Sequence, residues 1–371
     1  MKKTDTTLRD SPTYSEKNHL HGVCEWLSPS NIALVKYWGK KHEQLPRNPS
    51  ISFTLDKART VTRLEWELKK STGDQIVDFH FLFHGQPKPE FSARIQKFLN
   101  RAALELPELR NYRLHISSKN TFPHSSGIAS SASAMSALSA ALIDMDAQIK
   151  GRPITQPPYK TDLGRRISYL SRLGSGSACR SIFPQAALWG KCSFESSSDE
   201  YAVGLKAQLH PVFQQFGDAI LLVDQGQKKV SSSAGHQLME NNPFADVRYD
   251  QARSNTEKLL NILQTGALDE FTTLVEAEAL SLHALMMAST PGYILMHPYT
   301  IEVIHHIRGF RQSTGIPVCF TLDAGPNVHL LYPHADRKKV IEFIQSQLLP
   351  YCHEGQWIDD QMGMGVQKSN P

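Results

Sequence analysis

Hydrophobic and polar residues alternate through much of the first half of the chain, as they do in strands that bury one face. The stretches "ISFTLD", "TVTRLEWEL", "IVDFHFLFHG" and "YRLHISSKN" follow this pattern. The stretch "NIALVKYWGK" is typical of a short strand that runs into a loop. Two more strands are expected around "AALWGK" and "YAVGLKAQL".

Segments whose apolar residues recur at helical spacing lie between these strands. In "FSARIQKFLNRAALEL" the apolar residues Ile95, Phe98, Leu99 and Ala102 fall on one helical face. After Ser130, small Ala and Ser residues surround a stripe of larger apolar side chains, which predicts a buried helix. A further helix, "TDLGRRISYLSRLG", is expected to end at its final glycine.

A second set of elements begins near residue 205. "AILLVDQG" predicts a buried strand, and "PVCFTLDAG" and "NVHLLYP" predict two more on either side of a Gly-Pro loop. Amphipathic helices are expected in "YDQARSNTEKLLNILQTG", "LDEFTTLVEAEALSLHALMMAST", "TIEVIHHIRGFRQST" and "RKKVIEFIQSQL". The pattern therefore predicts an α+β protein with a disordered tail over 1–18, an N-terminal domain over 19–205 and a C-terminal domain over 206–371.

Composition and charge narrow the function classes. The 371 residues are 40% hydrophobic and 20% charged, an ordinary globular balance, and the net charge is +4 without a dense Lys/Arg run. This argues against a nucleic-acid partner and suits a small anionic substrate. Neither an apolar segment after the basic start nor a run of membrane-spanning length occurs, so we expect a cytoplasmic protein.

Cysteine and histidine spacing gives no metal or disulfide pattern. The five cysteines are scattered and form no CxxC, which argues against a disulfide framework or a zinc site and favours a reducing compartment. The sixteen histidines show no HExxH or other metal-ligand spacing, so no protein motif for a metal is expected.

The stretch "FPHSSGIASSASAMSAL" is the strongest candidate for a phosphate site. Glycine and serines precede a predicted helix, where exposed amide groups and the helix dipole favour an anion. The alternative is a small-residue helix packed tightly against a sheet. The stretch is neither a Walker P-loop nor a GxGxxG fingerprint. The candidate phosphate-binding residues are Ser126, Gly127, Ala129, Ser130, Ser131 and Ser133.

Two further stretches carry residue types suited to an anionic substrate. In "GSGSACRS", bare glycine backbone lies beside Ser175, Ser177 and Arg180, and arginine is the fork-shaped donor for carboxylate or phosphate. The alternative is the loop at a helix C-terminus with a surface arginine. In "TLDAGPN", Asp323 ends an apolar strand, where it could act as a base or simply cap the turn.

Polar loops elsewhere supply other candidates. "NIALVKYWGKK" places Lys36 and Lys40 around Tyr37, which could bind phosphate or could belong to an ordinary surface. In "KKVSSSAGH", Ser231 and Ser232 are candidate substrate donors.

Together and in this order, these stretches resemble the diphosphomevalonate decarboxylase family of the GHMP kinase superfamily. "SPSNIALVKYWGKKHEQLPRNPSISFTL" is similar to the opening signature, and "NTFPHSSGIASSASAMSAL" resembles the phosphate loop P-x-x-x-G-[LI]-x-S-S-[AS]. "SRLGSGSACRSIF" and "TLDAGPNVHLLY" resemble the next two motifs, and the likeness extends to "QMGMGVQ". The loop departs from the family at His124, Ser125 and Ser126, where Thr-Ala-Ala is usual.

The resemblance implies a GHMP kinase fold, in which an N-terminal half like ribosomal protein S5 domain 2 and a ferredoxin-like C-terminal half enclose the active site in the cleft between them. It implies a carboxy-lyase of the mevalonate pathway of isoprenoid biosynthesis. ATP would phosphorylate the 3-hydroxyl of mevalonate 5-diphosphate. Loss of that phosphate and of CO2 would then give isopentenyl diphosphate. It also implies a homodimer.

Roles follow from the matched positions. Asp323 would orient or deprotonate the 3-hydroxyl, and Lys36 would stabilise charge beside it. Arg180, with Asn31 nearby, would hold the substrate carboxylate. Mg²⁺ would lie between the ATP phosphates, with Ser130 as the one candidate protein ligand. The residues expected at the diphosphate end are Tyr37, Lys40, Ser175 and Ser177.

Four other functions stay open. A mevalonate 3-kinase would phosphorylate without decarboxylating, and a related decarboxylase would use the monophosphate. A GHMP-fold binding module would lack turnover, and a nucleic-acid role would predict salt-sensitive binding. The presence of both Asp323 and Lys36 argues against the pure kinase.

Overall fold

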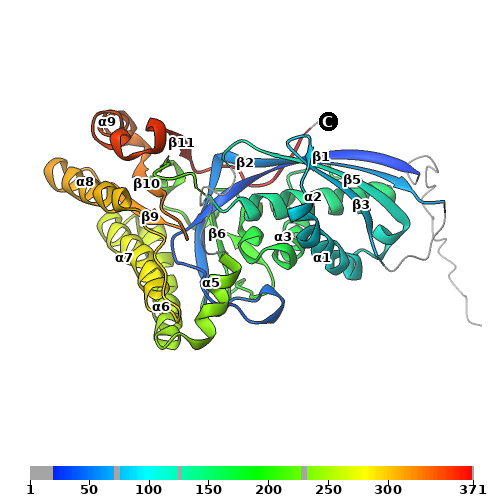
Figure 1. The fold of residues 1–371 in the computed structure, drawn as a ribbon, viewed down its shortest axis with the longest axis horizontal. Coiled ribbons are helices and arrows are strands. Elements are labelled where there is room, and N and C mark those ends of the chain that lie inside the picture. Colours follow the sequence, from blue (N-terminus) through cyan, green and yellow to red (C-terminus); the bar gives the residue numbers. More distant parts are fainter. Residues whose placement is uncertain (1–19, 71–75, 124–127, 227–231, 370–371) are drawn as a thin grey trace, which may run out of the picture.

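The computed structural model describes residues 20–70, 76–123, 128–226 and 232–369. Two β-sheets, each covered by helices, lie side by side along the long axis of the molecule (Figure 1). The candidate site residues Ser126, Gly127 and Ser231 lie outside the described residues, as does the expected tail over 1–18.

The larger sheet belongs mainly to the first half of the chain. Its main path has the order β12-β1-β2-β5-β3-β4, and β6 extends it by pairing with both β2 and β7. Pairing is antiparallel except between β3 and β5. The strands are β1 (His21–Ala33), β2 (Ser50–Leu68), β3 (Asp78–Phe83), β4 (Gln86–Pro87), β5 (Tyr112–Asn120), β6 (Ala186–Trp189), β7 (Ala202–Gly204) and β12 (Gln367–Ser369).

Three helices cover one face of this sheet: α1 (Pro89–Glu105), α2 (Ser130–Ile149) and α3 (Asp162–Gly174). Their apolar side chains pack on strand residues such as Trp26, Leu64 and Leu114 in one continuous core. The small residues of α2 allow it to lie close to β1 and β2, and fifteen of its residues are buried. The predicted buried helix after Ser130 is confirmed.

The smaller sheet has the order β11-β8-β10-β9 and is antiparallel throughout. Its strands are β8 (Phe216–Leu221), β9 (Cys319–Leu322), β10 (Val328–Pro333) and β11 (Trp357–Gln361). The helices of this half are α4 (Pro211–Gln214), α5 (Ser232–Leu238), α6 (Ala245–Thr265), α7 (Leu268–Met287), α8 (Pro298–Thr314) and α9 (Arg337–Phe343).

Several element predictions differ from the structure in detail. The two strands expected over "ISFTLD" and "TVTRLEWEL" form the single strand β2 of 19 residues. The strand expected around "YAVGLKAQL" covers only β7, because the 3₁₀ turn Lys206–Gln208 interrupts it. The last expected helix is α9, which continues from Ile344 to Leu348 as a π-helical turn.

The two halves share a core and a strand. The ring centroid of Phe53 of β2 lies 5.8 Å from that of Phe216 and 5.9 Å from that of Phe271, both in the second half, and Phe213 belongs to the same core cluster. The final strand β12 returns to pair with β1 in the larger sheet. The predicted domain boundary near residue 205 stays a prediction, and these contacts hold the two sheets in one fixed arrangement around the space between them.

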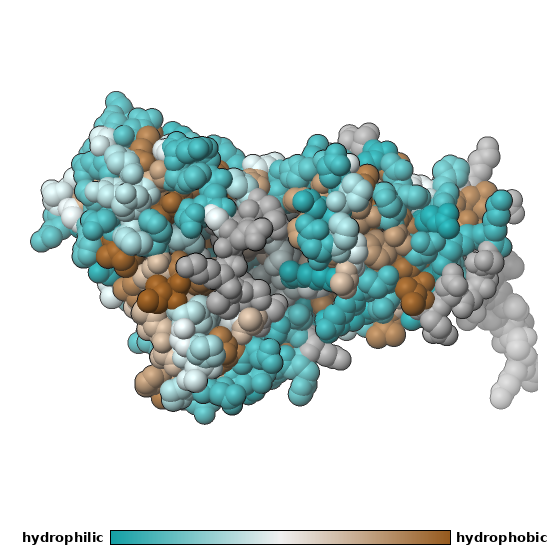
Figure 2. Space-filling model, in the orientation of Figure 1, coloured by the Kyte–Doolittle hydropathy of each residue, from teal (hydrophilic) through white to brown (hydrophobic). Residues whose placement is uncertain are grey.

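In the view of Figure 2 the surface is mostly hydrophilic, and apolar patches lie over both halves of the chain. None of the helices in the described ranges is both long and apolar enough to cross a membrane.

A buried carboxylate joins the two sheets directly. Asp360 of β11, which is 1% exposed, accepts hydrogen bonds from the backbone N–H groups of Asp56, Lys57 and Ala58 at 2.7–2.9 Å. The three charge-assisted bonds satisfy one buried and two partly buried amide groups.

We expect Asp360→Ala to lower the free energy of unfolding by about 3 kcal/mol, because it leaves one buried and two partly buried amide groups without their acceptor. The neighbouring Asp359 is a matched control, since its pairs with Lys57 and Arg337 lie at the surface. Asp359→Ala should cost under about 1 kcal/mol. Urea unfolding of both variants measures the difference, and equal costs would contradict this account of the junction.

Candidate active site

A cavity of about 540 Å³ opens between the two sheets. Its walls come from β1 and the loop after it, from α1, α2, β3 and β5, and from the turn that follows α3. The second half contributes His236 of α5, Leu282 of α7, and Asp323 and Ala324 after β9. Eleven of the predicted site residues line it: Asn31, Lys36, Tyr37, Lys40, Ala129, Ser130, Ser131, Ser175, Ser177, Arg180 and Asp323.

A cation from the first half of the chain and a carboxylate from the second half lie next to each other in the wall of this cavity. Lys36 Nζ, from the loop after β1, lies 3.7 Å from Asp323 Oδ1, from the end of β9. Lys36 is 2% exposed and also donates to the carbonyl of Ala33 at 2.5 Å, whereas the Asp323 side chain is 25% exposed. Burial lowers the pKa of Lys36 to about 8, and the charge of Asp323 opposes that shift. The Lys36 ammonium group therefore loses its proton near pH 8, far below the pH at which an ordinary lysine does.

The backbone of Lys36 is fixed by a buried ion pair. Its N–H group donates to Glu278 Oε2 of α7 at 2.9 Å, and Glu278 is fully buried. Arg248 of α6 binds both oxygens of Glu278, and Asn255 donates to Oε1 at 2.6 Å. Since the carboxylate is fully partnered, its negative charge can be retained in the interior.

Asp323 is also positioned from α7. His283 Nε2 lies 3.1 Å from the backbone carbonyl of Asp323, which requires the proton on Nε2. Burial lowers the pKa of His283 to about 4, so the imidazole is neutral at ordinary pH. Glu278 and His283 stand one and a half helical turns apart, and this single helix orients both members of the Lys36–Asp323 pair.

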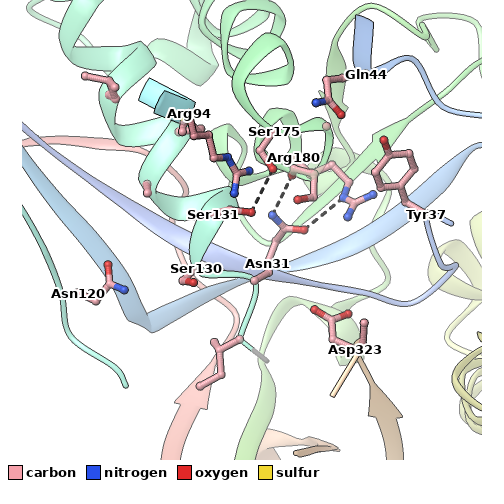
Figure 3. A pocket seen from close by; sticks show the side chains of 18 of the residues that line it. Asn31, Tyr37, Gln44, Arg94, Asn120, Ser130, Ser131, Ser175, Arg180 and Asp323 are labelled. Carbon is pink, nitrogen blue, oxygen red and sulfur yellow. Dashed lines mark hydrogen bonds between the residues drawn. The ribbon is translucent and has the colours of Figure 1, made fainter. Parts of the chain in front are cut away.

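Arg180 forms a third charged wall and is only 2% exposed. Its Nε donates to Asn31 Oδ1 at 3.2 Å (Figure 3). Its Nη1 donates to Ser50 Oγ at 2.6 Å. Asn31 in turn donates to the carbonyl of Ser177 and to Ser181 Oγ. Burial lowers the pKa of Arg180. The hydrogen bonds of its Nε and Nη1 fix the guanidinium group, and its remaining N–H groups are available to bind an anion.

A second group of cations lies at the α1 side of the cavity. Lys40 and Arg94 both line it, and burial lowers the pKa of each, with Arg94 adding to the effect on Lys40. In Figure 3 the Arg94 side chain points from above toward Ser131 and Ser175, whose hydroxyls lie 3.2 Å apart. The Tyr37 hydroxyl is buried and has no hydrogen-bond partner among the described residues. Unpaired donors beside concentrated positive charge favour an anion.

The start of α2 forms the remaining polar wall. Ala129 adopts φ +28°, a backbone conformation that alanine rarely occupies, directly before the helix. The cavity is lined there by Ala129, Ser130 and Ser131, with the N-terminus of a 20-residue helix behind them.

Ser133 does not reach the cavity. Its hydroxyl is fully buried and lies 2.6 Å from Thr60 Oγ1 of β2, on the sheet side of α2. The placement of Ser133 therefore gives no support to the prediction that it binds phosphate. Successive side chains along a helix differ in direction by about 100°, so Ser133 can face the sheet although Ser130 and Ser131 line the cavity.

Some cavity residues were missed from the sequence. Arg94 lines the cavity although it lies outside every stretch chosen for its chemistry, and Gln44 and Asn120 line it although they were not singled out within their stretches. Arg94 stands on the polar side of α1 one position before the buried Ile95, which is also the pattern of an ordinary surface residue. Only the closeness of Arg94 to Lys40 in the folded chain distinguishes it from an ordinary surface residue. Among the described residues, no cluster of three or more His, Cys, Asp or Glu side chains could hold a metal ion.

Family models match both halves of the chain. The diphosphomevalonate decarboxylase-like N-terminal domain matches residues 28–202, and the mevalonate 5-diphosphate decarboxylase C-terminal domain matches residues 219–370.

Individual proteins give the same result. The diphosphomevalonate decarboxylase of Ganoderma lucidum is 31% identical over 336 residues, covering 85% of this chain and 80% of that protein. The crystal structure of mevalonate diphosphate decarboxylase from Staphylococcus aureus has a TM-score of 0.78 at 29% identity, covering 95% of this chain and 99% of that one. MDDEF in complex with MVAPP, AMPPCP and magnesium has a TM-score of 0.77 at 26% identity, covering 95% and 100%.

The lowered pKa of Lys36 predicts a pH dependence. The ammonium form dominates below pH 8 and is lost as the pH rises through about 8, so turnover that requires this charge should fall on the alkaline side with an apparent pKa near 8. We would measure kcat of the wild type from pH 6 to 9.5. A Lys57→Gln variant at the surface should keep the same profile. A constant kcat up to pH 9.5 would remove the charged lysine from the reaction.

Proposed function

This chain belongs to the diphosphomevalonate decarboxylase family. We propose roles for polar residues around its cavity in the ATP-dependent decarboxylation of mevalonate 5-diphosphate. The activity itself is that of a carboxy-lyase of isoprenoid synthesis. The observation that carries the proposal is the Lys36–Asp323 pair, which lines one cavity together with Arg180 and with the cations Lys40 and Arg94.

The first step is phosphoryl transfer to a hindered tertiary alcohol. The 3-oxygen of the substrate attacks the γ-phosphorus of ATP, the bond to the β,γ-bridging oxygen breaks, and ADP leaves. Asp323 orients the hydroxyl or accepts its proton, and Lys36 offsets the negative charge that spreads over the transferred group. Fixed charges suit this step, because positioning and electrostatic stabilisation supply most of the rate in phosphoryl transfer.

The second step breaks two bonds. The 3-phosphate leaves with the electron pair of the C3–O bond, and the electrons of the bond between the carboxylate and C2 form the C2–C3 double bond as CO2 departs. Arg180, held by Asn31 and Ser50, orients the carboxylate. Its remaining donors allow an orienting contact, whereas a stronger grip would oppose the loss of CO2.

The diphosphate end of the substrate is proposed to lie against Tyr37, Lys40, Ser175 and Ser177. Arg94 joins this group, because it and Lys40 are the cations that line the α1 side of the described cavity. An anion there would partner the buried Tyr37 hydroxyl and relieve the repulsion between the two cations. The Ser232 side chain and Ser231 lie outside what the structure describes and stay predictions.

ATP is proposed to place its phosphates at the N-terminus of α2, against Ser130, Ser131 and the neighbouring amides. Mg²⁺ when bound would neutralise the phosphate oxygens and align them. The residues fit this arrangement, since a hydroxyl beside a helix N-terminus can add one oxygen ligand while the phosphates supply the rest. The family structure with AMPPCP and magnesium supports the same pairing. The homodimer and the cytoplasmic location stay predictions.

The test is to mix the purified protein with ATP, Mg²⁺ and mevalonate 5-diphosphate and to follow ADP and CO2 separately. We expect the two products in equal amounts. ADP without CO2 would indicate a 3-kinase and would require new roles for Arg180 and Lys36. Turnover with mevalonate 5-phosphate alone would move the substrate assignment to the monophosphate.

We expect Asp323→Asn to reduce kcat by at least about 10³-fold, because the amide neither accepts the proton nor pairs with Lys36. The dissociation constant for mevalonate 5-diphosphate, measured by calorimetry, should change only a few-fold, since the phosphate and carboxylate contacts remain. Asp359→Asn, at the surface of the same half, should behave as the wild type. Full activity of the Asp323 variant would remove this residue from the chemistry.

A further inference from the structure

The loop from Lys36 to Lys41 carries three of the proposed site residues but has no helix or strand of its own apart from one bridge between Lys40 and Pro46. Such a segment samples several conformations unless other groups fix it. Two of its amide groups donate to side chains of the second half of the chain. Lys36 N–H donates to Glu278, and Gly39 N–H donates to His236 Nδ1 at 2.9 Å.

His236 contacts the same loop through its ring. The centroid of the imidazole lies 4.5 Å from that of Tyr37 and 4.7 Å from that of Trp38. The preceding residue brings the backbone of α5 against the loop as well, because a Cβ added at Gly235 would stand 2.5 Å from the Trp38 ring. The helix and the loop therefore touch through both backbone and side chains.

The conformation of Gly39 makes the accepted hydrogen bond specific. Its φ is +94°, which glycine adopts without strain, and a Cβ there would lie 2.1 Å from the Tyr249 hydroxyl. Glycine is therefore required at this position, and its N–H group donates to His236 Nδ1. The hydrogen bond fixes the residue between Trp38 and Lys40.

The ring is neutral in this arrangement. Nδ1 must lack a proton to accept from Gly39, so the single imidazole proton is on Nε2. Burial, and then the positive charge of Lys40, lower the pKa of His236 to about 3. A protonated ring would both lose the acceptor and repel Lys40, so the neutral form is the one that holds the loop.

We propose that His236 is a positioning residue for the diphosphate end of the site, because it holds Tyr37 and Lys40 in place through the Gly39 amide and two ring contacts. This inference rests on the proposed function, in which those two residues bind the diphosphate. The loop from Lys36 to Lys41 is then fixed at two places, by Glu278 at Lys36 and by His236 at Gly39. Glu278 orients the residue beside the reacting oxygen, and His236 orients the residues that bind the remote phosphates.

Two variants separate the hydrogen bond from the ring. His236→Phe keeps an aromatic ring against Tyr37 and Trp38 but has no acceptor for Gly39. His236→Asn loses the ring but places a carbonyl oxygen close to the position of Nδ1. If the Phe variant does not fold, His236→Leu removes the acceptor in the same way.

We expect His236→Phe to raise the KM and the calorimetric dissociation constant for mevalonate 5-diphosphate about tenfold, the size of one lost hydrogen bond that orders a binding loop. The kcat and the KM for ATP should stay within about twofold. His236→Asn should recover much of the affinity. An unchanged KM in the Phe variant, or an equal loss for both substrates and kcat, would overturn the proposal.

Failure of the proposed function would look different. In that case the wild type itself would neither bind mevalonate 5-diphosphate nor release CO2 from it. A wild type that does both, beside a Phe variant that matches it, would count against His236 alone.

Discussion

The contact between Lys36 and Asp323 is the interaction on which the rest of the site depends. A buried ammonium and a partly exposed carboxylate come from opposite halves of the chain and lie 3.7 Å apart. Such a pair persists in a poorly solvated place only when other groups hold both partners. Glu278 holds the lysine through its amide, and His283 holds the aspartate through its carbonyl. Because both stand on α7, one rigid helix sets the distance between the reacting groups.

The shared core explains why the cleft has a defined width. Phe53 of the larger sheet packs among aromatic rings of the second half, and Asp360 joins the two sheets through three amide hydrogen bonds. A cavity between two sheets could open and close if only loops connected them. Here buried contacts on the far side of the cleft keep Arg180 and Asp323 in one arrangement, which the electrostatic mechanism requires.

Sequence patterns predicted most of the helices and strands, for physical reasons. Alternation and helical spacing report burial of one face, so β5, α2 and α3 were found close to their observed limits. Glycine and serine mark places where backbone approaches an anion, and Ser130, Ser175 and Ser177, which were chosen on that basis, line the cavity. Ser133 was chosen on the same basis but lies against β2, because this composition also suits close packing of a helix on a sheet. The binding roles of these serines stay predictions.

The residues that were missed share a different property. Arg94, Glu278, His236 and His283 lie inside ordinary amphipathic or polar stretches, where a charged or polar residue is expected at the surface. Each acts through a partner far away in the chain. Glu278 meets Lys36 across 242 positions, and His236 meets Gly39 across 197. Local periodicity contains no information about such contacts, so only the tertiary structure reveals them.

The most direct test of this account is the pKa of Lys36 itself, followed by NMR of the lysine Nζ group in the wild type and in Asp323→Asn. The account predicts a pKa near 8 in the wild type, because burial outweighs the attraction of the carboxylate, and a lower pKa in the variant, because that attraction is gone. A pKa near the ordinary value of about 10.4 in both proteins would contradict the buried, coupled pair.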